Sequence, residues 1–205
     1  MVETLISIDT WLFLKLNAGV ANPVFDAVMP IVTNIKYWRI PILIYFAGLV
    51  VFGGGKGRSA FLVAIVLFTI TDQLSSHVLK DWIGRLRPCH VVEGVRLIHG
   101  CGGSKSMPSG HATNTMAAAI FFGLTFRRWF PVLLFLSLLV SYSRIYMGIH
   151  YPADLLFGWV LGGSIAYGVL YVQRRYLQQH LERLRPFRPR WSDPHPLNAH
   201  TRTNG

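Results

Sequence analysis

Hydrophobic residues form long, nearly uninterrupted blocks along this chain, and polar residues gather between the blocks. The clearest blocks lie at 59–79, 112–126, 130–145 and 154–172. The first would be about 30 Å long as an α-helix, which matches the hydrocarbon thickness of a bilayer. A fifth block, 38–52, reaches that length only if residues before it join its helix. The pattern predicts an all-α fold, a polytopic bundle of membrane helices.

The N-terminal segment allows two interpretations, which decide the number of spans. Residues 5–16 carry Asp9 and Lys15 among apolar side chains, a composition typical of a helix in the membrane interface. Residues 24–35 would form about 18 Å of helix, too short to cross alone, and Pro23 marks a break before them. The two segments form either one bent span or none. We predict six spans, with five as the alternative.

Composition agrees with a membrane protein, because 52% of the residues are hydrophobic and only 14% are charged. The formal net charge of +11 would suit nucleic-acid binding, but the basic residues lie at block ends and in 174–205 rather than on one soluble face. We therefore expect no nucleic-acid partner. The expected organisation is a membrane-embedded domain, 1–175, followed by a basic cytoplasmic tail, 176–205, that is largely disordered.

Lysine and arginine in the short loops orient the bundle. Helix alternation puts the basic turns at 56–58 and 127–128 on the same side as the basic C-terminus, and the positive-inside rule makes that side cytoplasmic. The loops 80–108 and 146–153 then share the outer face. The longer loop is itself basic, against the rule, and an anionic substrate would explain this exception.

Polar clusters lie at span ends on the predicted outer face. Lys80, Arg87 and Arg144 supply three cations. Ser109 and Gly110 stand where a helix begins, so free backbone N–H groups and the positive end of the helix dipole point into the same space. An arginine at a span end usually snorkels, and a Ser-Gly pair is usually a plain cap. Their combination on one face predicts a phosphate-binding cradle.

Two histidines add the reactive groups that such a cradle lacks. His150 and Asp154 are four residues apart at a predicted helix start, so the carboxylate can hold one ring nitrogen while the other attacks phosphorus. His111, at the same level, is suited to protonate the leaving oxygen. A single histidine near a helix start is more often structural, but together these groups form a complete phosphoryl-transfer site.

The clusters resemble the signature of the type-2 phosphatidic acid phosphatase superfamily: Lys, six residues, Arg-Pro; then Pro-Ser-Gly-His; then Ser-Arg, five residues, His, three residues, Asp. Every signature position is matched, by Lys80, Arg87, Pro88, Pro108, Ser109, Gly110, His111, Ser143, Arg144, His150 and Asp154. The resemblance implies a helical bundle and a phosphohistidine route that needs neither a metal nor another cofactor. The loops show no carboxylate cluster suited to magnesium.

The same resemblance implies a role for each residue. His150 would be the nucleophile and Asp154 its orienting partner. His111 would act first as general acid and then as the base that activates water. The phosphoryl oxygens would be held by Lys80, Arg87, Ser109, Gly110 and Arg144.

A site at headgroup height implies a phosphorylated membrane lipid as substrate. The stretch 8–17, followed by Asn22, Asp26 and Thr33, resembles the N-terminal region of bacterial undecaprenyl-diphosphate phosphatases in this superfamily. Undecaprenyl diphosphate is therefore the leading substrate, and the bacterial inner membrane the expected location. Phosphatidylglycerol phosphate, phosphatidic acid and lipid A phosphate are alternatives, and a lipid phosphotransferase would have the same motifs.

Two other functions fit the sequence less well. Vanadium haloperoxidases have a similar site but are soluble, whereas the long apolar blocks of this chain indicate a membrane protein. A non-catalytic membrane transporter or scaffold would be expected to lack one of the two histidines, and both His111 and His150 are present.

The two cysteines, Cys89 and Cys101, lie in the predicted outer loop with eleven residues between them. In an oxidising compartment they would form a disulfide whose loop closure contributes about 3 kcal/mol. Two free thiols are an alternative, and so is a metal site with His90 and His99, although the spacing is not that of a zinc site.

Overall fold

The computed structural model describes residues 2–183, and in that range the chain is helical without a β-strand. The elements are, in chain order, α1 (Val2–Asn17), α2 (Pro23–Thr33), α3 (Ile35–Phe52), α4 (Gly54–Asp72), the π-helix η1 (Gln73–Val78), α5 (Leu79–Ile83), α6 (Pro88–Val91), α7 (Gly110–Thr125), the 3₁₀ turn η2 (Arg127–Trp129), α8 (Phe130–Tyr146) and α9 (Pro152–Arg183).

The chain divides into two compact units, Met1–Leu170 and Tyr171–Gly205. The described part of the second unit is the continuation of α9 to Arg183. The predicted tail, 176–205, lies outside the described residues from residue 184 onward. All residues of the predicted site belong to the first unit.

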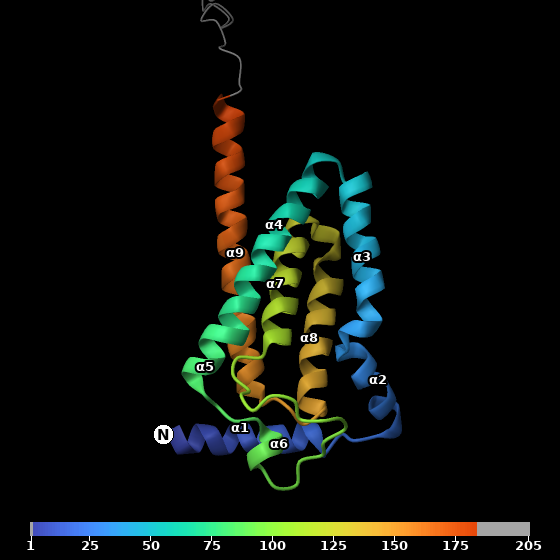
Figure 1. Ribbon diagram of the computed structural model, residues 1–205, viewed down its shortest axis with the longest axis vertical. Helices are drawn as coiled ribbons and strands as arrows, with labels where there is room; N and C mark the ends of the chain where they lie inside the picture. Colours follow the sequence, from blue (N-terminus) through green and yellow to red (C-terminus); the bar gives the residue numbers. More distant parts are fainter. Residues whose placement is uncertain (1, 184–205) are drawn as a thin grey trace, which may run out of the picture. The chain divides into compact units, whose positions relative to one another are not determined.

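In the first unit, α1 lies across one end of the bundle that contains α3, α4, α7 and α8 (Figure 1). The loop that joins α5 to α7, with the short helix α6, is found at the same end (Figure 1). α7 is the central helix, because it packs against α4, α8 and the beginning of α9. We call the end that carries α1 and this loop the site end.

Asparagine side chains set the ends of the N-terminal helices. Asn22 accepts a hydrogen bond from the backbone N–H of Phe25 at 2.9 Å, and Pro23 occupies the first turn of α2. Asn34 lies between α2 and α3 and caps the start of α3. Its side chain accepts a hydrogen bond from the backbone N–H of Lys36 at 3.0 Å. Such caps satisfy backbone donors that a helix start leaves free. The break predicted at Pro23 is thus confirmed.

Glycines bring α7 and α9 into close contact. A Cβ added at Gly162 would lie 2.1 Å from the Thr113 carbonyl oxygen, and one added at Gly158 would lie 2.9 Å from the Ser109 carbonyl oxygen. Small residues at this spacing let helix backbones approach closely in a membrane, where packing rather than hydrophobic burial drives association. The close approach holds the start of α7 beside the first turns of α9. The adjoining core contains Ala60, Ala64, Leu67, Ala117, Phe121, Phe122, Ala166 and Leu170.

Within residues 2–183, four helical segments are long and apolar enough to cross a membrane: Ile35–Phe52, Gly54–Ile83, Arg127–Tyr146 and Pro152–Tyr176. No residue of the α3 window is fully buried, although Phe46 and Leu49 pack against the core. α1 and α7 have only 16 residues each, fewer than the about 20 that a span usually needs. The predicted all-α membrane fold is confirmed, whereas the count of six spans is not confirmed by these lengths.

We expect Gly162→Ala to destabilise the protein by about 1–3 kcal/mol, because the new methyl group would collide with the backbone of α7, which cannot rotate away. Gly168 is a matched control on the same helix, since an added Cβ there meets nothing within 4 Å. Gly168→Ala should leave stability unchanged or raise it slightly, because alanine is the better helix former. Thermal unfolding of both variants in detergent checks this, and equal melting temperatures would contradict the close-packing interpretation.

Candidate active site

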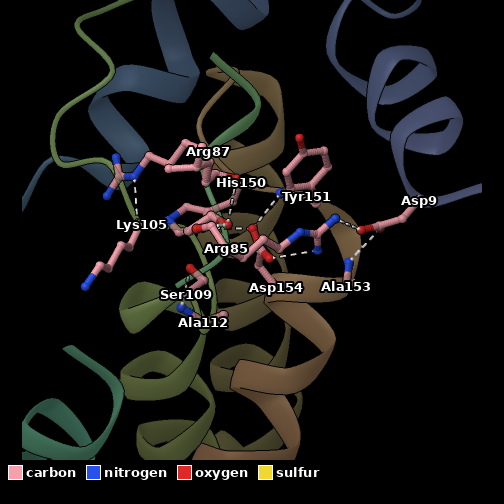
Figure 2. Close-up of polar contacts among 12 residues, drawn as sticks. Asp9, Arg85, Arg87, Lys105, Ser109, Ala112, His150, Tyr151, Ala153 and Asp154 are labelled. Atoms are coloured by element: carbon pink, nitrogen blue, oxygen red, sulfur yellow. Dashed lines mark hydrogen bonds and ion pairs between the residues drawn. The ribbon is translucent and has the colours of Figure 1, made fainter. Parts of the chain in front are cut away.

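The structure gathers the three polar clusters at the site end. Ser109 begins α7, Arg144 lies in the last turn of α8, and Asp154 lies in the first turn of α9. His150 lies in the short connection between α8 and α9, next to Asp154 (Figure 2). The Ser109 backbone N–H donates to the Asp154 carbonyl at 3.1 Å, which ties the second cluster directly to the third.

His150 and Asp154 form a buried pair. The His150 Nδ1 lies 3.4 Å from Asp154 Oδ2, and the two residues are 1% and 0% exposed. Because an ionised carboxylate can only accept hydrogen bonds, Nδ1 carries the proton and Nε2 keeps its lone pair. Burial lowers the pKa of the His150 imidazole to about 4, and the hydrogen bond to Asp154 opposes this shift only in part. At neutral pH the ring is therefore uncharged.

His111 lies in the first turn of α7, within electrostatic reach of the other site residues. Its ring interacts with the charges of Arg144 and Lys80 and with His150, and the backbone of Thr33 also contacts it. The two histidines that the sequence pairs thus belong to one site, on the same end of the bundle.

Ser109 and Gly110 position the beginning of α7 as predicted. The Ser109 side chain accepts from the Ala112 backbone N–H at 3.5 Å, a long N-cap bond. A Cβ at Gly110 would lie 3.2 Å from the Ser76 hydroxyl, so glycine lets η1 approach the helix start. The wide π-helical turn directly precedes Lys80, and such turns often occur at functional sites.

Two arginines bring donors to the same region. Arg144 donates from Nη1 to the Thr33 hydroxyl at 2.8 Å, while its buried Nε has no hydrogen-bond partner among the residues that the structure describes. A buried donor of this kind calls for an acceptor, and a phosphoryl oxygen would satisfy it. Arg87 donates from Nε to the Lys105 carbonyl at 3.2 Å and from Nη1 to the Cys101 carbonyl. Burial lowers the pKa of Arg87, but a guanidinium stays charged in proteins.

Sequence reasoning assigned no role to Arg85 and Asp9, which the structure places beside Asp154. Arg85 donates to Asp154 Oδ1 at 3.0 Å and to Asp9 Oδ2 at 2.6 Å (Figure 2). Its guanidinium carbon also lies 3.8 Å from the centre of the Tyr151 ring. The available signal was Asp9 itself, because a carboxylate in an otherwise apolar helix needs a partner.

The basic outer loop has a partly different explanation from the predicted one. Three of its five lysine and arginine residues are paired with carboxylates of the protein: Arg85 with Asp9 and Asp154, Arg96 with Asp26, and Lys105 with Asp81. The predicted explanation, an anionic substrate, is therefore needed for Lys80 and Arg87 only.

The structure joins Cys89 and Cys101 in a disulfide. Because Arg87 donates to the Cys101 carbonyl, the bridge helps to hold the arginine's loop in place. Among residues 2–183, the only group of side chains with the spacing of metal ligands is Cys89, His90 and Cys101, and both sulfur atoms are used in the bridge.

Comparison with known proteins supports the resemblance. The PAP2 superfamily matches residues 60–178. The chain is 35% identical over 172 residues to the lipid A 4′-phosphatase of Bacteroides thetaiotaomicron, covering 80% of this chain and 76% of that one. It is 36% identical over 109 residues to the undecaprenyl-diphosphatase of Sulfolobus acidocaldarius, covering 53% and 49%. The crystal structure of a PAP2-type phosphatidylglycerolphosphate phosphatase from Bacillus subtilis superposes with a TM-score of 0.63 at 25% identity, covering 90% of both chains.

We expect the acid limb of kcat/KM to lie near pH 4, because the lowered pKa of His150 keeps its Nε2 unprotonated until that pH. Activity is then lost as the pH falls through that value. Initial rates from pH 3 to 8 check this, after correction for ionisation of the substrate phosphate, which ³¹P NMR titration measures separately. A limb near 6.5 that remains after the correction would contradict a neutral, buried His150.

Proposed function

Because this chain belongs to the PAP2 superfamily, we propose that it is an integral membrane lipid phosphatase that works through a phosphohistidine. The observation that carries the proposal is the buried His150–Asp154 pair beside three cationic side chains. A carboxylate-bound imidazole with a free Nε2 is a nucleophile without a metal. Lys80, Arg87 and Arg144 supply the charge that a phosphoryl group needs.

In the first half-reaction, Nε2 of His150 attacks phosphorus, and the bond from phosphorus to the lipid-side oxygen breaks. His111 donates a proton to that oxygen, which leaves on the lipid product. The ring of His150 gains positive charge as the N–P bond forms, and Asp154 stabilises it through the Nδ1–H. The three cations and the N–H groups at the start of α7 hold the phosphoryl oxygens.

In the second half-reaction, neutral His111 takes a proton from water, and the water oxygen attacks phosphorus. The N–P bond breaks, its electron pair returns to Nε2, and inorganic phosphate leaves. A lipid phosphotransferase would share the first step but use a lipid hydroxyl in place of water. Product analysis separates the two, because only the phosphatase releases inorganic phosphate.

A phosphate monoester on lipid A is the substrate that the comparisons favour. The lipid A 4′-phosphatase relative aligns over 80% of this chain, whereas the undecaprenyl-diphosphatase relative aligns over 53%. Undecaprenyl diphosphate, which the sequence alone places first, is the second candidate. Neither the metal independence nor the diphosphatase activity follows from these similarities, and both stay predictions.

The arrangement at the site end also bears on topology. α1 contributes Asp9 to the same site as α9, so the N-terminal helix lies on the site side of the bundle. We propose five crossings, α3, α4 with its continuation to Ile83, α7, α8 and α9, with α1 in the outer interface. The site then faces the periplasm of a bacterial inner membrane, and the basic C-terminus lies in the cytoplasm.

His150→Ala should abolish phosphate release without loss of folded protein, because the proposed covalent intermediate forms on the His150 ring. His99→Ala is a matched control, since His99 is an exposed histidine of the loop between α5 and α7, and its ring lies against the Ile98 carbonyl. Trapping with ³²P-labelled lipid and an alkaline detergent quench should label wild type and His99→Ala but not His150→Ala. Appreciable turnover by His150→Ala would refute the nucleophile assignment.

Across a panel of lipid A, undecaprenyl diphosphate, phosphatidylglycerol phosphate and phosphatidic acid, we expect the highest kcat/KM for lipid A, by roughly tenfold or more. The assay is run by phosphate release from purified protein in mixed micelles, with and without EDTA. EDTA should not change the rates, because we propose no metal in the mechanism. A preference for undecaprenyl diphosphate would reverse the substrate order, and a requirement for magnesium would overturn the metal-free mechanism.

A further inference from the structure

A three-membered ion network connects the N-terminal helix to the carboxylate beside the nucleophile. Asp9 Oδ2 accepts from Arg85 at 2.6 Å, and Asp154 Oδ1 accepts from the same guanidinium at 3.0 Å (Figure 2). The side chains of Arg85 and Asp9 are only 22% and 12% exposed, and that of Asp154 is 0% exposed. Charges this poorly solvated interact more strongly than surface pairs.

Asp9 also fixes the backbone that carries Asp154. Its second oxygen, Oδ1, accepts from the Ala153 backbone N–H at 2.9 Å, in the first turn of α9. This donor is one that a helix start leaves without an intrahelical partner. One carboxylate of α1 therefore holds both the residue before Asp154 and the arginine bound to Asp154.

The face of α1 that carries Asp9 is built into the protein. Phe13, one turn later, is fully buried and packs its ring 5.5 Å from that of Tyr151. Asn17, two turns after Asp9, is also fully buried and donates to the carbonyls of Ile145 and Tyr146 at the end of α8. The spacing of four residues places all three on one side of the helix. α1 thus contacts the chain both before His150, at the end of α8, and after it, at Tyr151 and Ala153.

We propose that Asp9 is a positioning residue for the phosphatase reaction, acting on His150 through Arg85 and Asp154. The inference rests on the proposed function, because it presupposes that His150 is the nucleophile. Arg85 has one positive charge and shares it between two carboxylates, so the trio keeps one net negative charge. With Asp9 removed, Arg85 would pair with Asp154 alone and neutralise the charge that stabilises the His150 ring during attack.

This role predicts an effect on chemistry rather than on substrate binding. Among the contacts that the structure gives Asp9, none involves Lys80, Arg87 or Arg144. Those cations grip the phosphate in the ground state, whereas Asp154 matters most when the His150 ring becomes positive. Loss of an interaction that is made mainly in the transition state lowers kcat and leaves KM nearly unchanged.

The test compares Asp9→Asn, Asp9→Glu, Arg85→Gln and the double variant D9N/R85Q with Asp26→Asn. Asp26 is the matched control, since it is another N-terminal carboxylate that pairs with an outer-loop arginine, Arg96, and its other side-chain partner is Tyr146 rather than Asp154. kcat and KM are measured in mixed micelles with the lipid phosphate that wild type hydrolyses best. Thermal unfolding is measured for every variant, and the phosphoenzyme is trapped by alkaline quench.

We expect Asp9→Asn to lower kcat roughly tenfold with KM nearly unchanged, the size of effect that loss of a supporting partner often has. Asp9→Glu keeps the charge and should retain more of the activity than Asp9→Asn. In the Arg85→Gln background the same Asp9→Asn change should cost much less, because the link is already broken. Asp26→Asn should lower the melting temperature to a similar extent but keep kcat within about twofold of wild type.

Wild-type kcat for Asp9→Asn, a change in KM alone, or fully additive losses in the double variant would overturn the proposal. If Asp9→Asn does not fold, Arg85→Lys tests the same link, because lysine lacks the planar fork that binds two carboxylates and should give a similar loss of kcat. Failure of the proposed function has a different signature. Wild type would then give no phosphoenzyme and His150→Ala would remain active, whatever Asp9 does.

Discussion

A carboxylate that is shielded from solvent needs neighbouring groups to stabilise its charge. For Asp154, these groups come from three parts of the chain. Its side chain receives hydrogen bonds from the Tyr151 backbone and from Arg85, and it lies against the ring of His150. Its carbonyl accepts from Ser109, the cap of α7. Because desolvated charge is costly when any partner is missing, this one residue requires α9, the long loop and the connection after α8 to be in place together. The position of His150, the proposed nucleophile, follows from that requirement.

The helices can meet this requirement because their backbones come unusually close. Gly158 and Gly162 let α9 lie directly against Ser109 and Thr113 of α7. Gly110 does the same for η1, whose wide turn precedes Lys80. In lipid, where apolar surface gains little from being covered by protein, contact between backbones and buried polar bonds has to hold the bundle together. The glycines that pack the helices therefore also bring the proposed phosphate-binding groups to one end.

The sequence predicted the helical framework and the cluster of site residues because both depend on local features. Apolar blocks mark helices whatever their neighbours are, and motif spacing at helix starts indicates which residues share an end. Asp9 could not be assigned in this way, because its partner Arg85 is 76 residues away and only the fold brings the two together. The predicted span count is not confirmed, for a related reason. A helix of 16 residues, such as α1 or α7, is too short for length to decide whether it lies in the interface or inside the bundle.

The arginines at the site end fall into two sets that differ in how the protein compensates their charge. Arg85 and Arg96 are paired with carboxylates from the N-terminal helices, so their charge is already compensated in the protein. Arg87 and Arg144 instead bond to carbonyls and a hydroxyl, which carry no opposite charge, and Arg144 keeps a buried donor without a partner. A guanidinium satisfied by neutral groups retains its full charge for a bound anion. The arginines that stabilise the fold are therefore those whose charge is paired with a carboxylate. Those without a carboxylate partner are available to bind a phosphate.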